Sequence, residues 1–165
     1  FVPFFAILCG ASPLRTPQST RRKMHMDRQR KTPGFAGNIL AVLQAFNGLS
    51  AILGGTMLVM DPSGQGLKMQ KEWLSQTPFA DFLVPGIVLF VANGLGNLVG
   101  FWFTLKKHKQ SGLIGALFGL IMMFWITAQV MWIGYQSVLQ PLYFLTGLFQ
   151  VIFGYRVLKS TRPAV

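Results

Sequence analysis

Four long apolar stretches dominate the pattern of hydrophobic and polar positions along this chain. They cover about residues 35–60, 82–105, 112–135 and 141–158, and polar segments separate them. A helix needs about 20 apolar residues to cross a bilayer, so each stretch is close to the required length. Because lipid offers no hydrogen-bond partners, the backbone of each stretch must bond within its own helix. The sequence therefore predicts an all-α fold, a four-helix transmembrane bundle spanning residues 35–158.

The segment between the first two spans carries turn signals. The run Asp61-Pro62-Ser63-Gly64 has the residues of a type I turn and ends the first span. Further on, Thr77-Pro78 has the residues of an N-cap followed by proline at the first helical position. Pro85 then predicts either a kink in the second span or its true start. Between the two signals, the pattern leaves open a short interfacial helix and a mobile loop.

Composition and charge support lipid as the surroundings and predict an orientation. The chain is 52% hydrophobic and only 12% charged, about half the charged share of a typical soluble domain. Its net charge of +11 lies mainly in clusters beside the spans, six cations in residues 21–31 and three in 106–109. Such clusters mark the cytoplasmic side, so both termini are predicted to be cytoplasmic. Nucleic-acid binding is not expected, because the basic residues do not form a polar surface.

The two ends of the chain are predicted to lie outside the membrane domain. Residues 1–34 form a basic leader that begins with a short apolar run, too short to cross a bilayer. Met24 and Met26 each precede a short basic stretch and would make a sensible start. We therefore interpret the leader as a disordered or non-native extension. Residues 159–165 are expected to form a cytoplasmic tail.

The residue inventory predicts no catalytic site, cofactor or metal. Cys9 is the single cysteine, and His25 and His108 both lie in basic polar segments without further ligands at metal-binding spacing. No span has an ionisable residue near its centre, which argues against a proton relay or ion-coupled transport. Phosphate-binding loops and nucleophile elbows are also missing from the sequence.

Neutral polar residues inside the spans are the candidate functional positions. An unpaired carboxamide in hydrocarbon is costly, so these side chains are expected to face inward and bond between helices. A polar substrate site is the less favoured interpretation. Five candidates lie at matching depths in the first, second and fourth spans, and the sixth lies in the outer half of the third span beside two tryptophans: Asn47, Asn93, Asn97, Gln44, Gln150 and Gln129.

Small residues recur every four positions in the first three spans. Stripes of this kind let helix backbones approach closely in lipid, and they predict helix-packing surfaces. In the second and third spans the predicted packing residues are Ala92, Gly96, Gly100, Gly115 and Gly119. In the third span, Trp125 and its apolar neighbours are suited to line a pocket for a quinone or lipid, although plain packing is the ordinary interpretation.

The first hairpin resembles a group of small proteins. The runs Asp61-Pro62-Ser63-Gly64, Thr77-Pro78-Phe79, Asp81-Phe82 and Pro85-Gly86 are similar to a pattern in four-span bacterial membrane proteins of unassigned function. The resemblance covers only this hairpin. It implies a setting in the bacterial cytoplasmic (inner) membrane and no activity.

Three functional hypotheses follow from the sequence. The first is a non-enzymatic membrane protein, a helix bundle or accessory subunit that lies in the lipid bilayer and contacts its own copies or another membrane protein. The second is a carrier or binding protein for a neutral or lipidic small molecule, with Asn47, Asn93, Asn97 and Gln150 lining its site. A membrane enzyme comes third, because the chain offers no assembled chemistry.

Overall fold

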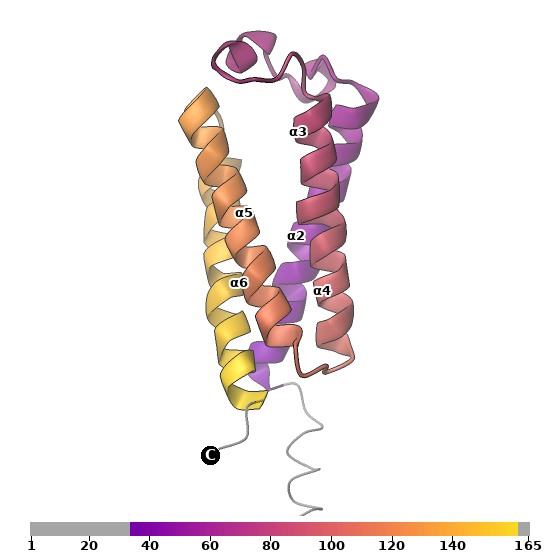
Figure 1. Ribbon diagram of the computed structural model, residues 1–165, viewed down its shortest axis with the longest axis vertical. Coiled ribbons are helices and arrows are strands. Elements are labelled where there is room, and N and C mark those ends of the chain that lie inside the picture. The colour runs from indigo at the N-terminus through magenta and orange to yellow at the C-terminus, as the bar shows by residue number, and fades with distance from the viewer. Residues whose placement is uncertain (1–33, 162–165) are drawn as a thin grey trace, which may run out of the picture. The chain divides into compact units, whose positions relative to one another are not determined.

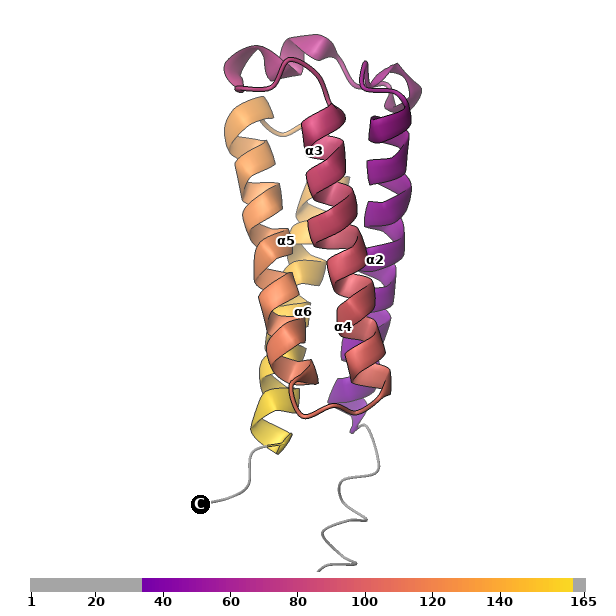
Figure 2. The ribbon, with the colours of Figure 1, turned by 45° about the vertical axis from the view of Figure 1, so that its right-hand side comes forward.

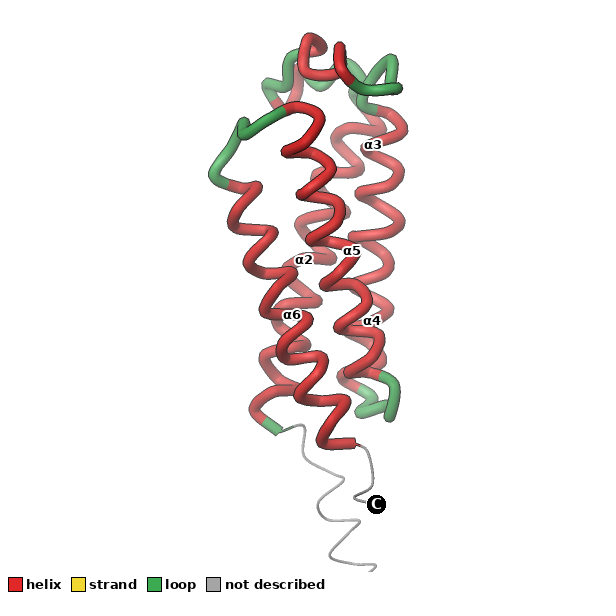
Figure 3. Tube along the Cα trace, turned by 60° about the vertical axis from the view of Figure 1, so that its left-hand side comes forward, coloured by secondary structure: helices red, strands yellow, loops and turns green. Residues whose placement is uncertain are grey.

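The computed structural model describes residues 34–161, and this part of the chain is helical without strands (Figure 3). Four helical segments are long and apolar enough to cross a membrane, as the sequence predicts. They are α2 (Phe35–Met60), a composite second span, α5 (Ser111–Ile133) and α6 (Leu139–Thr161). The composite span joins α3 (Leu83–Val88), a wider turn η3 (Leu89–Leu95) and α4 (Gly96–Leu105) (Figure 1). The predicted all-α fold with four spans is confirmed.

Several predicted boundaries shift for local reasons. The second span begins at Leu83, one residue from the predicted start at 82, and Thr77-Pro78 does not begin a helix. The Asp81 carboxylate accepts the backbone N–H of Leu83 at 2.9 Å. Pro85 consequently lies in the first helical turn, where proline costs no internal hydrogen bond. The third span ends at Ile133, because Gly134 takes a φ of 72° and leaves the helix. Helix α6 includes Lys159, which the sequence assigned to the tail.

The predicted leader, with Cys9, His25 and the basic cluster of residues 21–31, lies outside the described residues. The last four residues of the predicted tail do so as well.

The turn after α2 is built around the carboxylate of Asp61. Its Oδ1 accepts the hydroxyl of Ser63 at 2.5 Å and its Oδ2 accepts the N–H of Gly66 at 2.8 Å. These bonds lower the pKa of Asp61, the Ser63 hydroxyl most and the Gly66 N–H next. Gly64 closes the turn, with a φ of 76° and an N–H bond to the Asp61 carbonyl at 3.0 Å. The predicted turn is therefore formed, with a glycine where the backbone requires a positive φ.

Two short helices form in the predicted loop, η1 (Gln65–Leu67) and η2 (Lys71–Gln76). Leu74 of η2 is buried against Leu58 and Phe82, so the connection packs on the ends of α2 and α3. Figure 1 shows this connection reaching across to the end of α5. Of the two alternatives that the sequence left open, the structure has short helices.

Glycines bring the first two spans into backbone contact. A Cβ atom at Gly55 would lie 2.7 Å from the backbone nitrogen of Phe90, and one at Gly94 would lie 2.7 Å from Ile52. Likewise, a Cβ at Gly86 would lie 2.7 Å from the Cβ of Leu58. Figure 2 shows α2 alongside α3 and α4 over their length. These spans form one hairpin, which we call the first glycine-packed hairpin.

Helices α5 and α6 form the second glycine-packed hairpin (Figure 2). A Cβ at Gly112 would lie 2.4 Å from the backbone nitrogen of Leu158, and one at Gly119 would lie 2.7 Å from the carbonyl oxygen of Gly147. Real Cβ atoms do not approach backbone atoms this closely. Only glycine therefore fits at these positions with the helices at their present separation.

The wider turn η3 keeps the glycines of the second span in register. Gly48 and Gly55 are seven residues apart, about two helical turns, so both face the same neighbour. Gly86 and Gly94 are eight apart, which in a regular helix would turn the second glycine away by about 80°. In η3 the backbone bonds five residues back, as from the Gly96 N–H to the Val91 carbonyl, so this turn takes up one extra residue. Both glycines therefore face α2.

Candidate functional site

Five of the six predicted carboxamides are fully buried, each with an exposed fraction of 0%. They come from three spans, as their matching depths suggested: Gln44 and Asn47 from α2, Asn93 from η3, Asn97 from α4, and Gln150 from α6. Gln129 of α5 is half-buried and has no bond to any of them. The structure thus gathers three of the predicted side chains into one bonded group and leaves three outside it.

The bonded group, which we call the carboxamide network, connects the two hairpins. Asn47 Nδ2 donates to Gln150 Oε1 at 2.8 Å, and Gln150 Nε2 donates to Asn97 Oδ1 at 2.7 Å. The hydroxyl of Thr146 donates to Asn47 Oδ1 at 2.9 Å. All three bonds pass from the first glycine-packed hairpin to α6. Helices in lipid lack a hydrophobic driving force for association, so such bonds help to hold the hairpins together.

Backbone carbonyls complete the network. Gln150 Nε2 also donates to the carbonyl of Gly115 at 3.1 Å, and Asn97 Nδ2 donates to the carbonyl of Asn93 at 2.7 Å. Both N–H groups of Gln150 are therefore used. Every side-chain oxygen and nitrogen of Asn47, Asn97 and Gln150 therefore has a partner in the protein, and in this sense the network is closed.

Gln44 forms a separate contact within the first hairpin. The Thr104 hydroxyl lies 2.8 Å from Gln44 Oε1 and 3.0 Å from the Gly100 carbonyl. One hydroxyl proton serves one of these acceptors at a time. Gln44 Nε2 has no hydrogen-bond partner within residues 34–161, and it lies where a side chain on Gly100 would be. Gly100 therefore makes room for this buried amide.

Asn93 is the exception among the buried carboxamides. Neither its Nδ2 nor its Oδ1 has a hydrogen-bond partner within the described residues, although the side chain is 0% exposed. Its backbone carbonyl, in contrast, accepts from Asn97. The side chain therefore carries a desolvation cost without a compensating bond.

Four of the five predicted packing residues, the glycines, lie at contacts between helices of this chain. A Cβ at Gly96 would lie 2.2 Å from the Phe118 ring of α5, and one at Gly115 would lie 2.8 Å from Leu40 of α2. Gly100 faces Gln44 and Gly119 faces α6, while Ala92 is half-buried. The glycines of these stripes thus pack against other helices of the same bundle.

Sequence reasoning missed two threonines and several glycines. Thr104 and Thr146 bond to carboxamides. A threonine in a span usually bonds to its own helix, as both also do here, so nothing in the sequence distinguished these two. The glycines did carry a signal. Three helices contain pairs seven residues apart, which marks one face over two turns: Gly48 with Gly55, Gly112 with Gly119, and Gly147 with Gly154.

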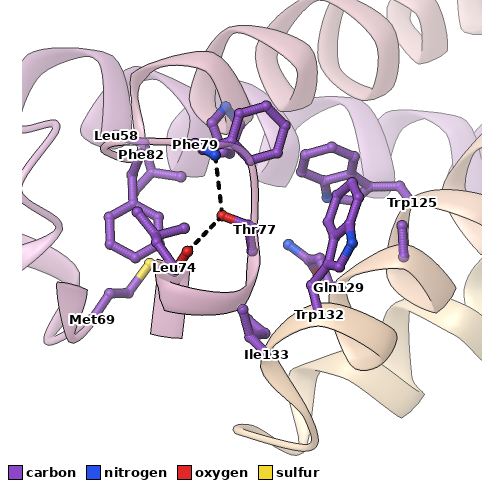
Figure 4. A pocket seen from close by; sticks show the side chains of 12 residues that line it. Leu58, Met69, Leu74, Thr77, Phe79, Phe82, Trp125, Gln129, Trp132 and Ile133 are labelled. Carbon is purple, nitrogen blue, oxygen red and sulfur yellow. Dashed lines mark hydrogen bonds between the residues drawn. The ribbon is translucent and has the colours of Figure 1, made fainter. Parts of the chain in front are cut away.

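Gln129 and Trp125 line a pocket at the outer-loop end of the bundle (Figure 4). The enclosed volume is about 50 Å³, and the space is partly open to the surroundings. Its walls come from the ends of α2 and α3, the connection between them, and α5: Leu58, Met69, Leu74, Thr77, Phe79, Phe82, Pro85, Trp125, Ala128, Gln129, Trp132 and Ile133.

Ionisable side chains in the described part of the chain lie at the helix ends and in the connections. Residues 34–161 contain no group of three or more His, Cys, Asp and Glu side chains that could hold a metal ion. Four membrane-length apolar helices with a neutral polar interior are the architecture of a multi-pass membrane protein. Comparisons with protein-family models, curated proteins and solved structures gave no match.

Proposed function

We propose that this chain is a non-enzymatic accessory subunit of the bacterial cytoplasmic membrane, acting through contact with other membrane proteins or its own copies. The observation that carries the proposal is the closed carboxamide network. Asn47, Asn97 and Gln150 bond to one another and to the backbone and are 0% exposed, so none of them faces a space that a substrate could enter. A bundle of this kind would provide a rigid surface to which other membrane helices bind, and it would not catalyse a reaction.

Photo-crosslinking in cells tests this role. We would place benzoylphenylalanine at Phe124, which is 76% exposed on α5, and at Met131, which is 80% exposed two turns further along the same face of that helix. At native expression level we expect a discrete adduct with a second copy or another membrane protein. Buried Met122 of the same helix, 2% exposed, is the matched control and should give no protein adduct. Adducts with lipid alone at both exposed positions would contradict the accessory role.

The proposal includes cytoplasmic termini, which charge supports. The α4–α5 connection carries Lys106, Lys107 and Lys109, and the end of α6 carries Arg156 and Lys159. Antiparallel helices bring these cations to one end of the bundle, and no described acid accompanies them. The opposite connection has two lysines and three acids, so the positive-inside rule assigns the first end to the cytoplasm.

Cysteine labelling in intact cells tests this orientation. In a Cys9→Ser background, Gln70→Cys places a thiol in the connection between α2 and α3, and Gln110→Cys places one between α4 and α5. Both residues are exposed. We expect a membrane-impermeant maleimide to label position 70 in whole cells and position 110 only after permeabilisation. The reverse pattern would contradict the proposed orientation.

A carrier with a polar site at mid-depth is less well supported. That function would need Asn47, Asn97 and Gln150 to face a ligand, but their amides are bonded to each other. Small-molecule binding is favoured instead by the outer pocket, which holds a different predicted residue, Gln129.

A further inference from the structure

The outer pocket has uncharged walls. Its twelve lining residues are apolar or aromatic except for Thr77 and Gln129. The adjoining connection contains Lys68 and Lys71 against Asp61, Glu72 and Asp81, a formal surplus of one negative charge. An anionic head group would therefore find no cation in the walls and a weakly repulsive connection beside them. The pocket suits a neutral occupant.

One carboxamide faces this apolar space. The Gln129 amide forms no hydrogen bond with the described residues, and Figure 4 shows it pointing from α5 towards Thr77. The Thr77 hydroxyl is already engaged, since it donates to the Leu74 carbonyl at 2.9 Å and accepts the Phe79 N–H at 3.2 Å (Figure 4). Beside the indole N–H groups of Trp125 and Trp132, the Gln129 amide is thus available to an entering molecule, and it can donate to a carbonyl oxygen.

Aromatic side chains form the wall around Gln129. The rings of Phe79 and Trp132 meet edge to face at 5.7 Å, and Trp125 lies one helical turn from Gln129 on the same helix. Flat apolar rings pack well against such walls. The pocket lies at the ends of the spans, where the surrounding side chains are apolar and face lipid, as the exposed Met131 does.

We propose that this pocket binds the head group of a neutral, lipid-soluble quinone. The ring would pack against Trp125 and Trp132, a ring carbonyl would accept from Gln129, and the apolar tail would remain in the bilayer. The enclosed volume of about 50 Å³ is smaller than a typical small-molecule site, so only the edge of the ring that carries the carbonyl would enter the pocket, through its open side. The inference is independent of the accessory role, because binding a quinone neither requires nor excludes contact with another membrane protein.

Quenching of tryptophan fluorescence by a decyl-benzoquinone tests the proposal on the full chain in lipid nanodiscs. Trp125 and Trp132 line the pocket, whereas Trp102 lies at the other end of the second span. We expect saturable quenching, weakened about tenfold in Gln129→Leu, because one net hydrogen bond accounts for up to that factor. Thr127→Val is the matched control: Thr127 is exposed on the same helix and bonds only to the Met123 carbonyl, so binding should be unchanged.

A second variant tests the same pocket by filling it. Ala128→Leu fills the pocket from its wall and should abolish saturable quenching while leaving the thermal unfolding of the protein cooperative. If that variant fails to fold, the Gln129→Leu and Thr127→Val pair decides the matter. Quenching that rises linearly with quinone, or that is equal in Gln129→Leu and the unaltered chain, would overturn the site. A co-purifying phospholipid that Gln129→Leu releases would overturn the choice of a quinone.

Discussion

Replacing Gly154 by alanine should destabilise the bundle by about 2 kcal/mol, because overpacking a tight contact typically costs 1–3 kcal/mol. A Cβ at this position would lie 2.6 Å from the backbone nitrogen of Ala116 and 2.8 Å from the carbonyl oxygen of Gly112. Both atoms belong to the backbone of α5, so no side chain can rotate to relieve the clash. The helices of the second glycine-packed hairpin would have to separate. The free energy of unfolding, measured by titrating the micelle with a denaturing detergent, reports the loss.

Gly54→Ala is the matched control for that substitution. It adds the same methyl group to a helix of the membrane domain, but the nearest atom, Leu89 Cδ2, would lie 3.5 Å away, an ordinary contact. Because alanine favours helix more than glycine does, this variant should be as stable as the unaltered chain or slightly more so. Equal losses in Gly54→Ala and Gly154→Ala would contradict the backbone contact between α5 and α6.

Asn47→Leu and Asn93→Leu should differ in their effects although the two substitutions are identical. Leucine has the same branching and number of side-chain heavy atoms as asparagine, and both positions are 0% exposed. Asn47 makes two side-chain bonds, with Gln150 and Thr146, whereas the Asn93 side chain makes none. At about 0.6 kcal/mol for an average bond between membrane helices, Asn47→Leu should cost at least 1 kcal/mol.

Asn93→Leu should cost little or raise stability, since it removes two buried polar atoms without partners. The same detergent titration measures both variants. A larger loss for Asn93→Leu than for Asn47→Leu would mean that Asn93 has a partner of its own and that the network is centred on the second span.

The fold could be predicted from the sequence because membrane-length apolar runs and turn residues are local signals. Length alone placed the four spans, and Asp61 to Gly64 marked the first turn. The start of the second span was harder to place. Thr77-Pro78 has the local chemistry of a helix start, but the helix begins at Leu83, where Asp81 accepts the first free N–H and Phe82 packs into the core.

Partners within the network could not be predicted, because depth gives the level of a side chain and not its direction. Asn47, Asn93 and Gln150 share a level, yet Asn47 bonds to Gln150 and Asn93 bonds to neither. That choice depends on how each helix is rotated about its axis. The rotation follows from the glycine contacts and from the extra residue in η3, neither of which is a local property.

The position of Gln129 depends likewise on tertiary structure. In the sequence it is one more carboxamide in a span, at a different depth from the others. Its place in a pocket follows from the connection between α2 and α3, which packs through Leu74 and brings Phe79 against Trp132 of α5. The two tryptophans that flank Gln129, Trp125 and Trp132, were visible in the sequence, but the wall that the connection forms opposite them was not.

A double-mutant cycle of Asn47→Leu and Gln150→Leu tests most directly whether the carboxamide network joins the two hairpins. We expect a coupling free energy of about 0.6–1.7 kcal/mol, the range from the average to the largest value for such bonds in membranes. The parallel cycle of Asn93→Leu and Gln150→Leu should give a coupling close to zero, because Asn93 has no side-chain bond. Additive effects of Asn47→Leu and Gln150→Leu would contradict a network that joins the hairpins.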